Sequence, residues 1–158
     1  MTGPAVRLTV NGREVELEDA PPGERLLDTL RWRLGLKGTK EGCRTGSCGA
    51  CTVLLDGQSA LSCLELTHEV DGASVTTIEG IADDPVGRCV RDAFDRAGAL
   101  QCGYCTPGFV MALTGLLRER GRATSLEELL EDLGGNLCRC TGYATIVRAA
   151  EIARTEAP

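Results

Sequence analysis

The feature that most constrains this 158-residue chain is the arrangement of its nine cysteines. Eight of them fall into two sets of four. The first set has the spacing Cys-x4-Cys-x2-Cys, with a fourth cysteine beyond eleven further residues, and the second pairs a Cys-x2-Cys run with a distant Cys-x-Cys run. The sets are Cys43, Cys48, Cys51 and Cys63, and Cys102, Cys105, Cys138 and Cys140. So many thiols in a chain of this size indicate either a disulfide framework or metal sites.

Targeting signals decide between these alternatives. The stretch Met1–Val10 lacks the charged region and long apolar run of a secretory leader. No segment reaches the roughly 18 apolar residues of a membrane span. The sequence therefore predicts a cytoplasmic chain, without a membrane span, whose cysteines hold metal instead of forming disulfides.

The first cysteine set has the spacing of plant-type [2Fe–2S] sites, in which three thiolates come from one loop and the fourth from a distant segment. Glycines at positions 42, 46 and 49 allow the tight wrap that such a loop needs. A zinc site is the alternative, but zinc sites usually pair two Cys-x2-Cys runs or include histidine. The single histidine, His68, has no such position. Cys43, Cys48, Cys51 and Cys63 are therefore the predicted ligands of one [2Fe–2S] cluster.

The second set is less specific when judged by spacing alone. A single Cys-x2-Cys run also occurs as a thioredoxin-like redox pair, although the helical pattern around it argues against that fold. Cys138-x-Cys140 is an unusual spacing for zinc. Each run comes just before a predicted helix, where free N–H groups favour an anionic cluster. A second cluster is the preferred interpretation.

The N-terminal half has the pattern of a β-grasp domain. A hairpin is predicted over 6–18, because alternating apolar residues flank Asn11-Gly12, which suits a type I′ turn. A helix over 24–34 carries a leucine stripe. Strands are predicted over 52–55 and 74–78, and 80–85 is predicted as a linker.

The C-terminal half is predicted to be a four-helix bundle. Its first helix carries an apolar stripe from Val86 to Ala97, and its second is opened by Thr106 as the N-cap and Pro107 as the first helical residue. A short helix with a capping box at Ser125 and a last helix over 143–153 follow. The predicted fold class is α+β, with a β-grasp ferredoxin-like domain over 1–80 and a bundle domain over 81–158. Each domain is expected to bind one [2Fe–2S] cluster.

Longer motifs surround both sets. They read Gly38-Thr-Lys-Glu-Gly-Cys43, Cys48-Gly-Ala-Cys51-Thr-Val53, Gln101-Cys-Gly-Tyr-Cys-Thr-Pro-Gly108 and Gly135-Asn-Leu-Cys-Arg-Cys-Thr-Gly-Tyr143. Together they resemble the small iron–sulfur subunit of the molybdenum hydroxylases, the family of xanthine dehydrogenase, aldehyde oxidoreductase and aerobic carbon monoxide dehydrogenase. The resemblance extends from about Val6 to Ala153, and all eight ligand positions are filled.

The resemblance implies an electron-transfer subunit of a heteromeric oxidoreductase. Electrons would pass from a molybdenum–pterin cofactor on a large subunit through two [2Fe–2S] clusters to a subunit with FAD or to an external acceptor. Gln101 and Cys140 would be the residues nearest the pterin, with Cys140 also an iron ligand. Substrate chemistry would take place on the partner, so this chain would hold no catalytic residue. A free-standing two-cluster ferredoxin and a structural zinc module are the alternatives.

The net charge of the chain argues against nucleic acid as a partner. The formal net charge is −6, and each oxidised cluster with its four thiolates adds about −2. Nucleic acid is therefore not an expected partner.

Cys89 lies on an apolar stripe and is expected in the bundle core, and His68 is expected to be an exposed polar residue. Trp32 is predicted to point away from its own core, between two arginines, as a residue of a protein interface does.

Overall fold

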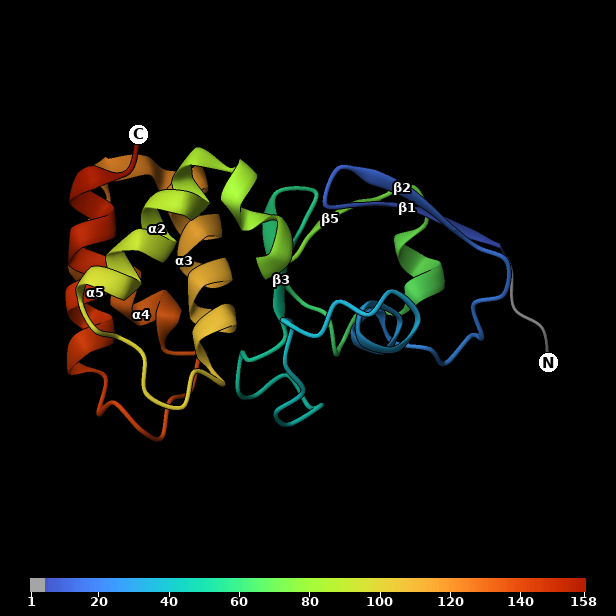
Figure 1. Cartoon of the computed structure of the whole chain (residues 1–158), viewed down its shortest axis with the longest axis horizontal. Helices are drawn as coiled ribbons and strands as arrows, with labels where there is room; N and C mark the ends of the chain where they lie inside the picture. The colour runs from blue at the N-terminus through green and yellow to red at the C-terminus, as the bar shows by residue number, and fades with distance from the viewer. Residues whose placement is uncertain (1–4) are drawn as a thin grey trace.

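The computed structural model describes residues 5–158, so the first four residues of the Met1–Val10 stretch lie outside it. One half of the molecule is a mixed five-stranded sheet with the order β2-β1-β5-β3-β4, and the other half is helical (Figure 1). β5 runs parallel to β1 and antiparallel to β3. The strands are β1 (Val6–Val10), β2 (Arg13–Leu17), β3 (Thr52–Leu55), β4 (Gln58–Leu61) and β5 (Ser74–Thr76).

The predicted hairpin is confirmed. β1 and β2 pair in antiparallel register from Val6 opposite Leu17 to Val10 opposite Arg13. Asn11 and Gly12 join them with φ angles of 50° and 75°, as a type I′ turn requires. The alternating valine and leucine side chains of β1 are buried.

The helix predicted over 24–34 has a different form. It begins as a single α-helical turn, α1 (Leu26–Asp28), and continues as a π-helix, η1 (Thr29–Arg33). The N–H of Leu34 donates to the carbonyl of Thr29, five residues back. The buried leucines 26, 27 and 30 confirm the predicted inward face. Apolar periodicity does not distinguish the two helix types over so few turns, since both bury one side.

Two further differences concern strands. β4 was not predicted, because Gln58-Ser-Ala-Leu61 has little β-branched or alternating character, yet it pairs with β3 across the Asp56-Gly57 turn. The predicted strand over 74–78 ends at Thr76, and Ile78 begins the 3₁₀ helix η3 (Ile78–Asp83). A shorter 3₁₀ helix, η2 (Thr67–Val70), includes the half-buried His68, which was expected to be exposed.

The segment predicted as a linker over 80–85 is part of a packed connection. Ile81 is buried in the core of the helical half. A Cβ atom at Gly80 would lie 2.4 Å from Oδ1 of Asn11, so the segment also lies against the sheet. Composition alone suggested an open linker. It could not distinguish the two cases, because glycine and proline occur in closely packed segments as well as in flexible ones.

The four-helix bundle is confirmed. It comprises α2 (Pro85–Arg96), α3 (Thr106–Arg120), α4 (Leu126–Leu133) and α5 (Ala144–Glu156), with a 3₁₀ turn, η4 (Gly121–Ala123), after α3. The capping box at Ser125 is present. Thr106 is not the N-cap of α3 as predicted; Cys105 takes that position. Cys89, which was expected inside the bundle core, is half-buried and packs against it.

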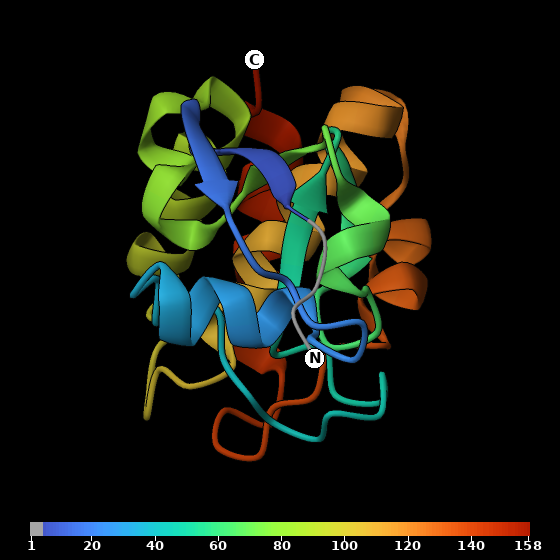
Figure 2. The ribbon, with the colours of Figure 1, turned by 90° about the vertical axis from the view of Figure 1, so that its right-hand side faces the viewer.

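α3 joins the two halves. Leu54 of β3 belongs to the bundle core. Two glycines on α3 permit close approach to the sheet domain: a Cβ atom at Gly108 would lie 2.4 Å from the carbonyl oxygen of Gly49, and one at Gly115 would lie 2.1 Å from Oγ of Ser59. The loops that hold the cysteine sets therefore extend from the same end of the molecule (Figure 2).

Candidate metal centres

The β3–β4 hairpin brings the two ends of the first cysteine set together. Cys51 precedes β3 and Cys63 follows β4, and the hairpin pairs Thr52 with Leu61. The N–H and hydroxyl of Ser62 both donate to the carbonyl of Cys51, at 3.3 and 2.8 Å. Both thiols are buried. The unpredicted strand β4 is therefore what places the fourth cysteine.

Backbone donors point at the sulfur of Cys43. The N–H groups of Thr45 and Ser47 lie 3.4 and 3.3 Å from it. The Thr45 hydroxyl and N–H, with smaller contributions from Cys48 and Ser47, lower the pKa of Cys43 to about 6. A thiolate, the form that binds metal, is thus stabilised at this position.

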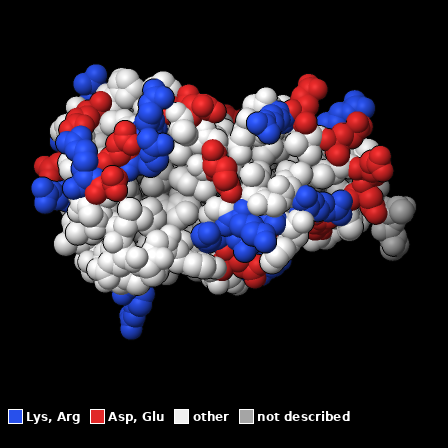
Figure 3. Space-filling view, in the orientation of Figure 1, with Lys and Arg blue, Asp and Glu red and all other residues white. Residues whose placement is uncertain are grey.

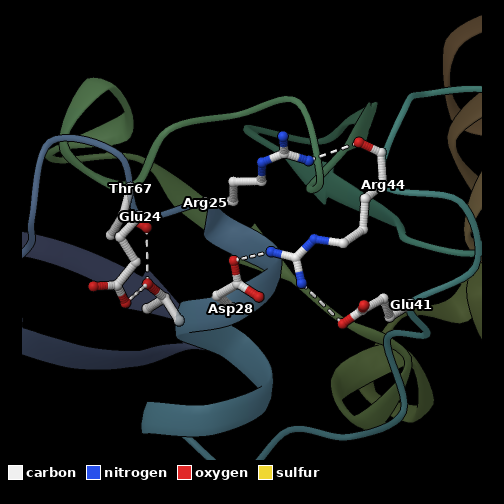
Figure 4. Close-up of polar contacts among 7 residues, drawn as sticks. Glu24, Arg25, Asp28, Glu41, Arg44 and Thr67 are labelled. Atoms are coloured by element: carbon white, nitrogen blue, oxygen red, sulfur yellow. Dashed lines mark hydrogen bonds and ion pairs between the residues drawn. The ribbon is translucent and has the colours of Figure 1, made fainter.

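Arg44 holds this loop against α1 (Figure 4). Its guanidinium forms ion pairs with Asp28 of α1 and with Glu41, and its carbonyl accepts a 2.6 Å hydrogen bond from Arg25. Its φ angle is 58°, a left-handed conformation that is uncommon outside glycine. Next to this network, the Thr29 hydroxyl donates to Glu24 and meets the Thr67 hydroxyl at 2.8 Å (Figure 4). We call Arg25, Asp28, Glu41 and Arg44 the Arg44 brace.

The second set lies at the end of the bundle. Cys105 is the N-cap of α3, and Cys138 and Cys140 precede Tyr143, the N-cap of α5. The Thr141 hydroxyl lies 3.2 Å from the sulfur of Cys138. Burial raises the pKa of Cys105 to about 12. Burial also acts to raise the pKa of Cys138, but hydrogen bonds from Thr141, from the backbone of Cys140 and from Cys105 together outweigh it and lower that pKa to about 7.

Within each set the thiols form two pairs. In the second set the sulfurs of Cys140 and Cys102 lie 3.4 Å apart, and Cys105 interacts with Cys138. In the first set Cys48 contributes to the lowered pKa of Cys43, and Cys63 acts on the pKa of Cys51. Burial, followed by interactions with Cys63, raises the pKa of Cys51 to about 12.

This paired arrangement fits a binuclear cluster, in which each iron takes two thiolates. Among residues 5–158, no group of three potential ligands is gathered closely enough for a single metal ion. The eight cysteines therefore remain the predicted ligands of the two clusters, and binding of iron would draw the thiols of each set together.

Direct contacts join the two cysteine loops. The N–H of Leu137 donates to the carbonyl of Cys48 at 3.0 Å, and the buried side-chain amide of Asn136 donates to the carbonyl of Gly49 at 3.0 Å. The Tyr104 hydroxyl donates to the carbonyl of Glu41 at 2.6 Å. A cavity of about 190 Å³ between the loops is lined by Cys48 and by all four cysteines of the second set.

The outer edge of the second set is open. Gln101, Cys102 and Cys140 are exposed, as are large parts of Tyr104 and Leu137. The sequence pattern did not single out Arg44, Asn136 or Tyr104. The positions of Asn136 and Tyr104 inside the quoted motifs were the only signal, and nothing marked Arg44, because ion pairs between distant segments leave no local pattern.

Family models match both halves of the chain. The description "2Fe-2S iron-sulfur cluster binding domain" covers residues 8–76, and "[2Fe-2S] binding domain" covers residues 77–151. The two domains together account for two [2Fe–2S] clusters. No helix in the described part of the chain is long and apolar enough to cross a membrane.

Relatives extend over nearly the whole chain. It is 44% identical over 143 residues to the xanthine dehydrogenase iron-sulfur-binding subunit of Escherichia coli, covering 90% of this chain and 89% of the relative. It is 42% identical over 148 residues to the nicotinate dehydrogenase small FeS subunit of Eubacterium barkeri, covering 94% and 93%. Quinoline 2-oxidoreductase of Pseudomonas putida 86 contains a chain with the same fold, with a TM-score of 0.82 at 39% identity and 98% coverage of both chains.

Proposed function

Because this chain belongs to the family of small iron–sulfur subunits of the molybdenum hydroxylases, we propose that it carries electrons from a molybdenum–pterin cofactor on a large partner subunit to a flavin subunit or an external acceptor. Membership identifies it as the electron-transfer subunit of a heteromeric oxidoreductase. The identity of the partners, the pterin and the FAD are the parts that we propose. The free-standing ferredoxin is not favoured, because the relatives named above are subunits of dehydrogenases.

The contact between the two cysteine loops is the observation that supports an internal electron path. The hydrogen bond from Leu137 to the carbonyl of Cys48 connects a residue adjacent to Cys138 with a ligand residue of the first set. Along this path, a thiol of one set is connected to a thiol of the other through covalent bonds and a single hydrogen bond. A path of this kind suits one-electron transfer between two clusters.

The residues of the chain prepare both sites for that task. The eight cysteines would hold the two clusters, each of which accepts and releases one electron when bound. The N–H groups of Thr45 and Ser47 would offset negative charge on the first cluster through the sulfur of Cys43. Hydrogen bonds to the ligand sulfurs are among the factors that set cluster potentials.

We assign the partner's pterin to the open edge of the second set. Gln101 and Cys140 lie there with exposed side chains, so a cofactor held by another subunit can approach them. Electrons would then enter at the second cluster and leave at the first. We also place the complex in the cytoplasm, where the ligand thiols stay reduced until iron binds.

The test is the composition of the native complex. The tagged chain, purified from its own host, should bring down a larger subunit with molybdenum and a pterin, and two clusters of two irons should give four irons per copy. Reduction with dithionite should give two distinct [2Fe–2S] signals in electron paramagnetic resonance. Stoichiometric zinc in place of iron, or an iron-loaded chain that forms no complex with a molybdenum protein, would refute the proposal.

A further inference from the structure

Trp32 is exposed to an extent that its own fold does not explain. Its side chain is 63% exposed, the largest value among the large apolar residues that the structure describes. It lies on η1, whose other side buries Leu30 in the sheet domain. An indole is a large, rigid apolar surface, and tryptophan is among the residues that dominate binding energy at protein interfaces.

Basic side chains surround this indole. The guanidinium carbon of Arg31 lies 5.3 Å from the ring centroid, and Nζ of Lys37 lies 5.9 Å from it. Nζ of Lys40 donates to the carbonyl of Lys37 at 2.8 Å. Figure 3 shows a group of basic side chains near the middle of the face drawn there, with acidic side chains next to it. We call Arg31, Trp32, Lys37 and Lys40 the Trp32 surface.

The cations of the Trp32 surface form no ion pair in the described part of the chain. None of the ion pairs in residues 5–158 involves Arg31, Lys37 or Lys40. Of the carboxylates in this region, Glu41 pairs with Arg44, whereas Glu79 accepts from two neutral donors, the N–H of Gly38 and the hydroxyl of Thr77, and keeps its charge. Three unpaired cations therefore stand together on a chain whose net charge is −6.

The surface is also held in place. Nη1 of Arg31 donates to the carbonyls of Lys37 and Thr39, at 3.2 and 2.7 Å, and Thr39 is buried. A side chain that is already ordered loses less conformational entropy when it binds a partner. Arg31 is half-buried by these contacts, whereas the indole of Trp32 stays exposed.

The Trp32 surface adjoins the first cysteine loop. The N–H of Lys40 donates to the carbonyl of Ala50 at 3.2 Å, which ties residues 37–40 to the segment that contains Cys48 and Cys51. A protein docked here would lie beside the first cysteine loop.

We propose that the Trp32 surface docks an acidic segment of the subunit that accepts electrons from the first cluster, an inference that rests on the proposed function. Carboxylates of that segment pair with Arg31, Lys37 and Lys40, and an apolar side chain covers the indole. A second copy of this chain is a poorer occupant, because two chains of net charge −6 repel each other.

Photo-crosslinking in the native complex tests the identity of the occupant. The photoreactive amino acid p-benzoylphenylalanine replaces Trp32 in the tagged full-length chain, and the crosslinked peptide is sequenced by mass spectrometry. The same substitution at Glu119, an exposed residue on α3, is the control. We expect a crosslink from position 32, and none to the same peptide from position 119, to an acidic segment of a subunit other than the molybdenum subunit. A crosslink to a second copy, to the molybdenum subunit or to a segment without acidic residues overturns the proposal, as does the absence of any crosslink.

Charge reversal tests the electrostatic part. The triple variant R31E/K37E/K40E should retain at least tenfold less of the crosslinked subunit than the wild-type chain does, while the molybdenum subunit stays bound. The matched control R88E/R91E/R148E makes the same change of net charge on exposed residues of the bundle, and it should retain both subunits. Equal retention in the two variants overturns the proposal.

The two proposals fail in different ways. Absence of molybdenum from the wild-type complex, or of the two cluster signals after reduction with dithionite, contradicts the proposed function itself. Normal molybdenum content and normal cluster signals, combined with a crosslink elsewhere or with no effect of charge reversal, contradict only the docking proposal.

Discussion

At the scale of single residues, Arg44 combines a strained backbone with several anchoring contacts. Its left-handed φ of 58° is offset by ion pairs with Asp28 and Glu41 and by the hydrogen bond from Arg25 to its carbonyl. Each partly exposed pair contributes only about 0.2–1 kcal/mol. The Arg44 brace therefore acts mainly by fixing the loop between Cys43 and Cys48 and by placing a positive charge next to the first cluster.

Replacement of Arg44 by Gln should lower the midpoint potential of the first cluster and leave that of the second unchanged. The neutral side chain no longer favours the extra negative charge of the reduced cluster, since net charge near a cluster helps to set its potential. Redox titration followed by electron paramagnetic resonance measures both potentials. Arg44→Lys should restore the potential, and Arg91→Gln, which removes an ion pair on α2, should change neither. Equal shifts of both clusters would contradict this role.

Asn136 is the second residue whose loss can be measured directly. Replacement by Ala removes a buried hydrogen bond to the carbonyl of Gly49, and an unsatisfied buried group costs about 1–3 kcal/mol. We expect the two cysteine loops to separate and electron transfer between the clusters to slow, with both potentials unchanged. Pulse radiolysis of the iron-loaded chain measures this rate. A wild-type rate in the Asn136→Ala variant would show that the amide does not position the path.

At the scale of elements, α3 is the helix that sets the position of the bundle domain against the sheet domain. It follows its N-cap Cys105, a predicted ligand, packs in the bundle through residues such as Phe109 and Leu113, and meets the sheet domain through Gly108 and Gly115. Side chains at these two glycines would occupy space that the sheet domain already fills. The close approach of α3 thus fixes the distance between the cysteine sets.

Gly108→Ala tests this contact, because two effects of opposite sign compete. Helix propensity alone would stabilise the variant by about 1 kcal/mol. The new Cβ, however, would meet backbone atoms of Gly49 and Ala50 at 2.4 and 3.0 Å, and overpacking typically costs about 1–3 kcal/mol. We expect net destabilisation in thermal unfolding and slower electron transfer between clusters. Gly135→Ala, where a Cβ meets nothing within 4 Å, is the control, and a more stable Gly108→Ala variant would contradict the packing argument.

At the scale of the whole molecule, two separate domains hold two clusters whose loops touch at one end. The order of electron transfer follows from which loop faces which partner. The open edge at Gln101 and Cys140 suits entry, and the Trp32 surface lies beside the first loop, where electrons would leave.

Breaking the path at each end tests this order in the complex, with the substrate that reduces the wild-type enzyme. Cys105→Ser should damage the second cluster and leave the substrate unable to reduce the first. Cys48→Ser should damage the first cluster, so the substrate still reduces the second cluster rapidly while turnover with the final acceptor fails. Both variants must retain molybdenum and assembly, because loss of a cluster can unfold its domain. If Cys48→Ser instead blocks reduction of the second cluster, the order is reversed.

The sequence by itself determined the chemistry and most of the elements. Cysteine spacing and the surrounding motifs predicted two [2Fe–2S] domains and the family. Asn11-Gly12 and the Ser125 capping box predicted local structure correctly, and the leucine stripe predicted the buried face of its helix but not the helix type. These signals are local: a turn, a cap or a ligand loop is specified by neighbouring residues. The ligand roles of the eight cysteines and the domain boundary at 80 remain predictions.

Tertiary structure decided what depends on distant segments. β4 forms because β3 offers it a partner, and it places Cys63 beside Cys51. Residues 78–83 form a packed 3₁₀ helix, because Ile81 fills the bundle core and Gly80 meets Asn11. The Arg44 brace, the bond from Asn136 to Gly49 and the unpaired charges around Trp32 arise only when the chain folds, since a hydrogen bond or an unmet charge is a property of the surroundings of a side chain and not of its place in the sequence.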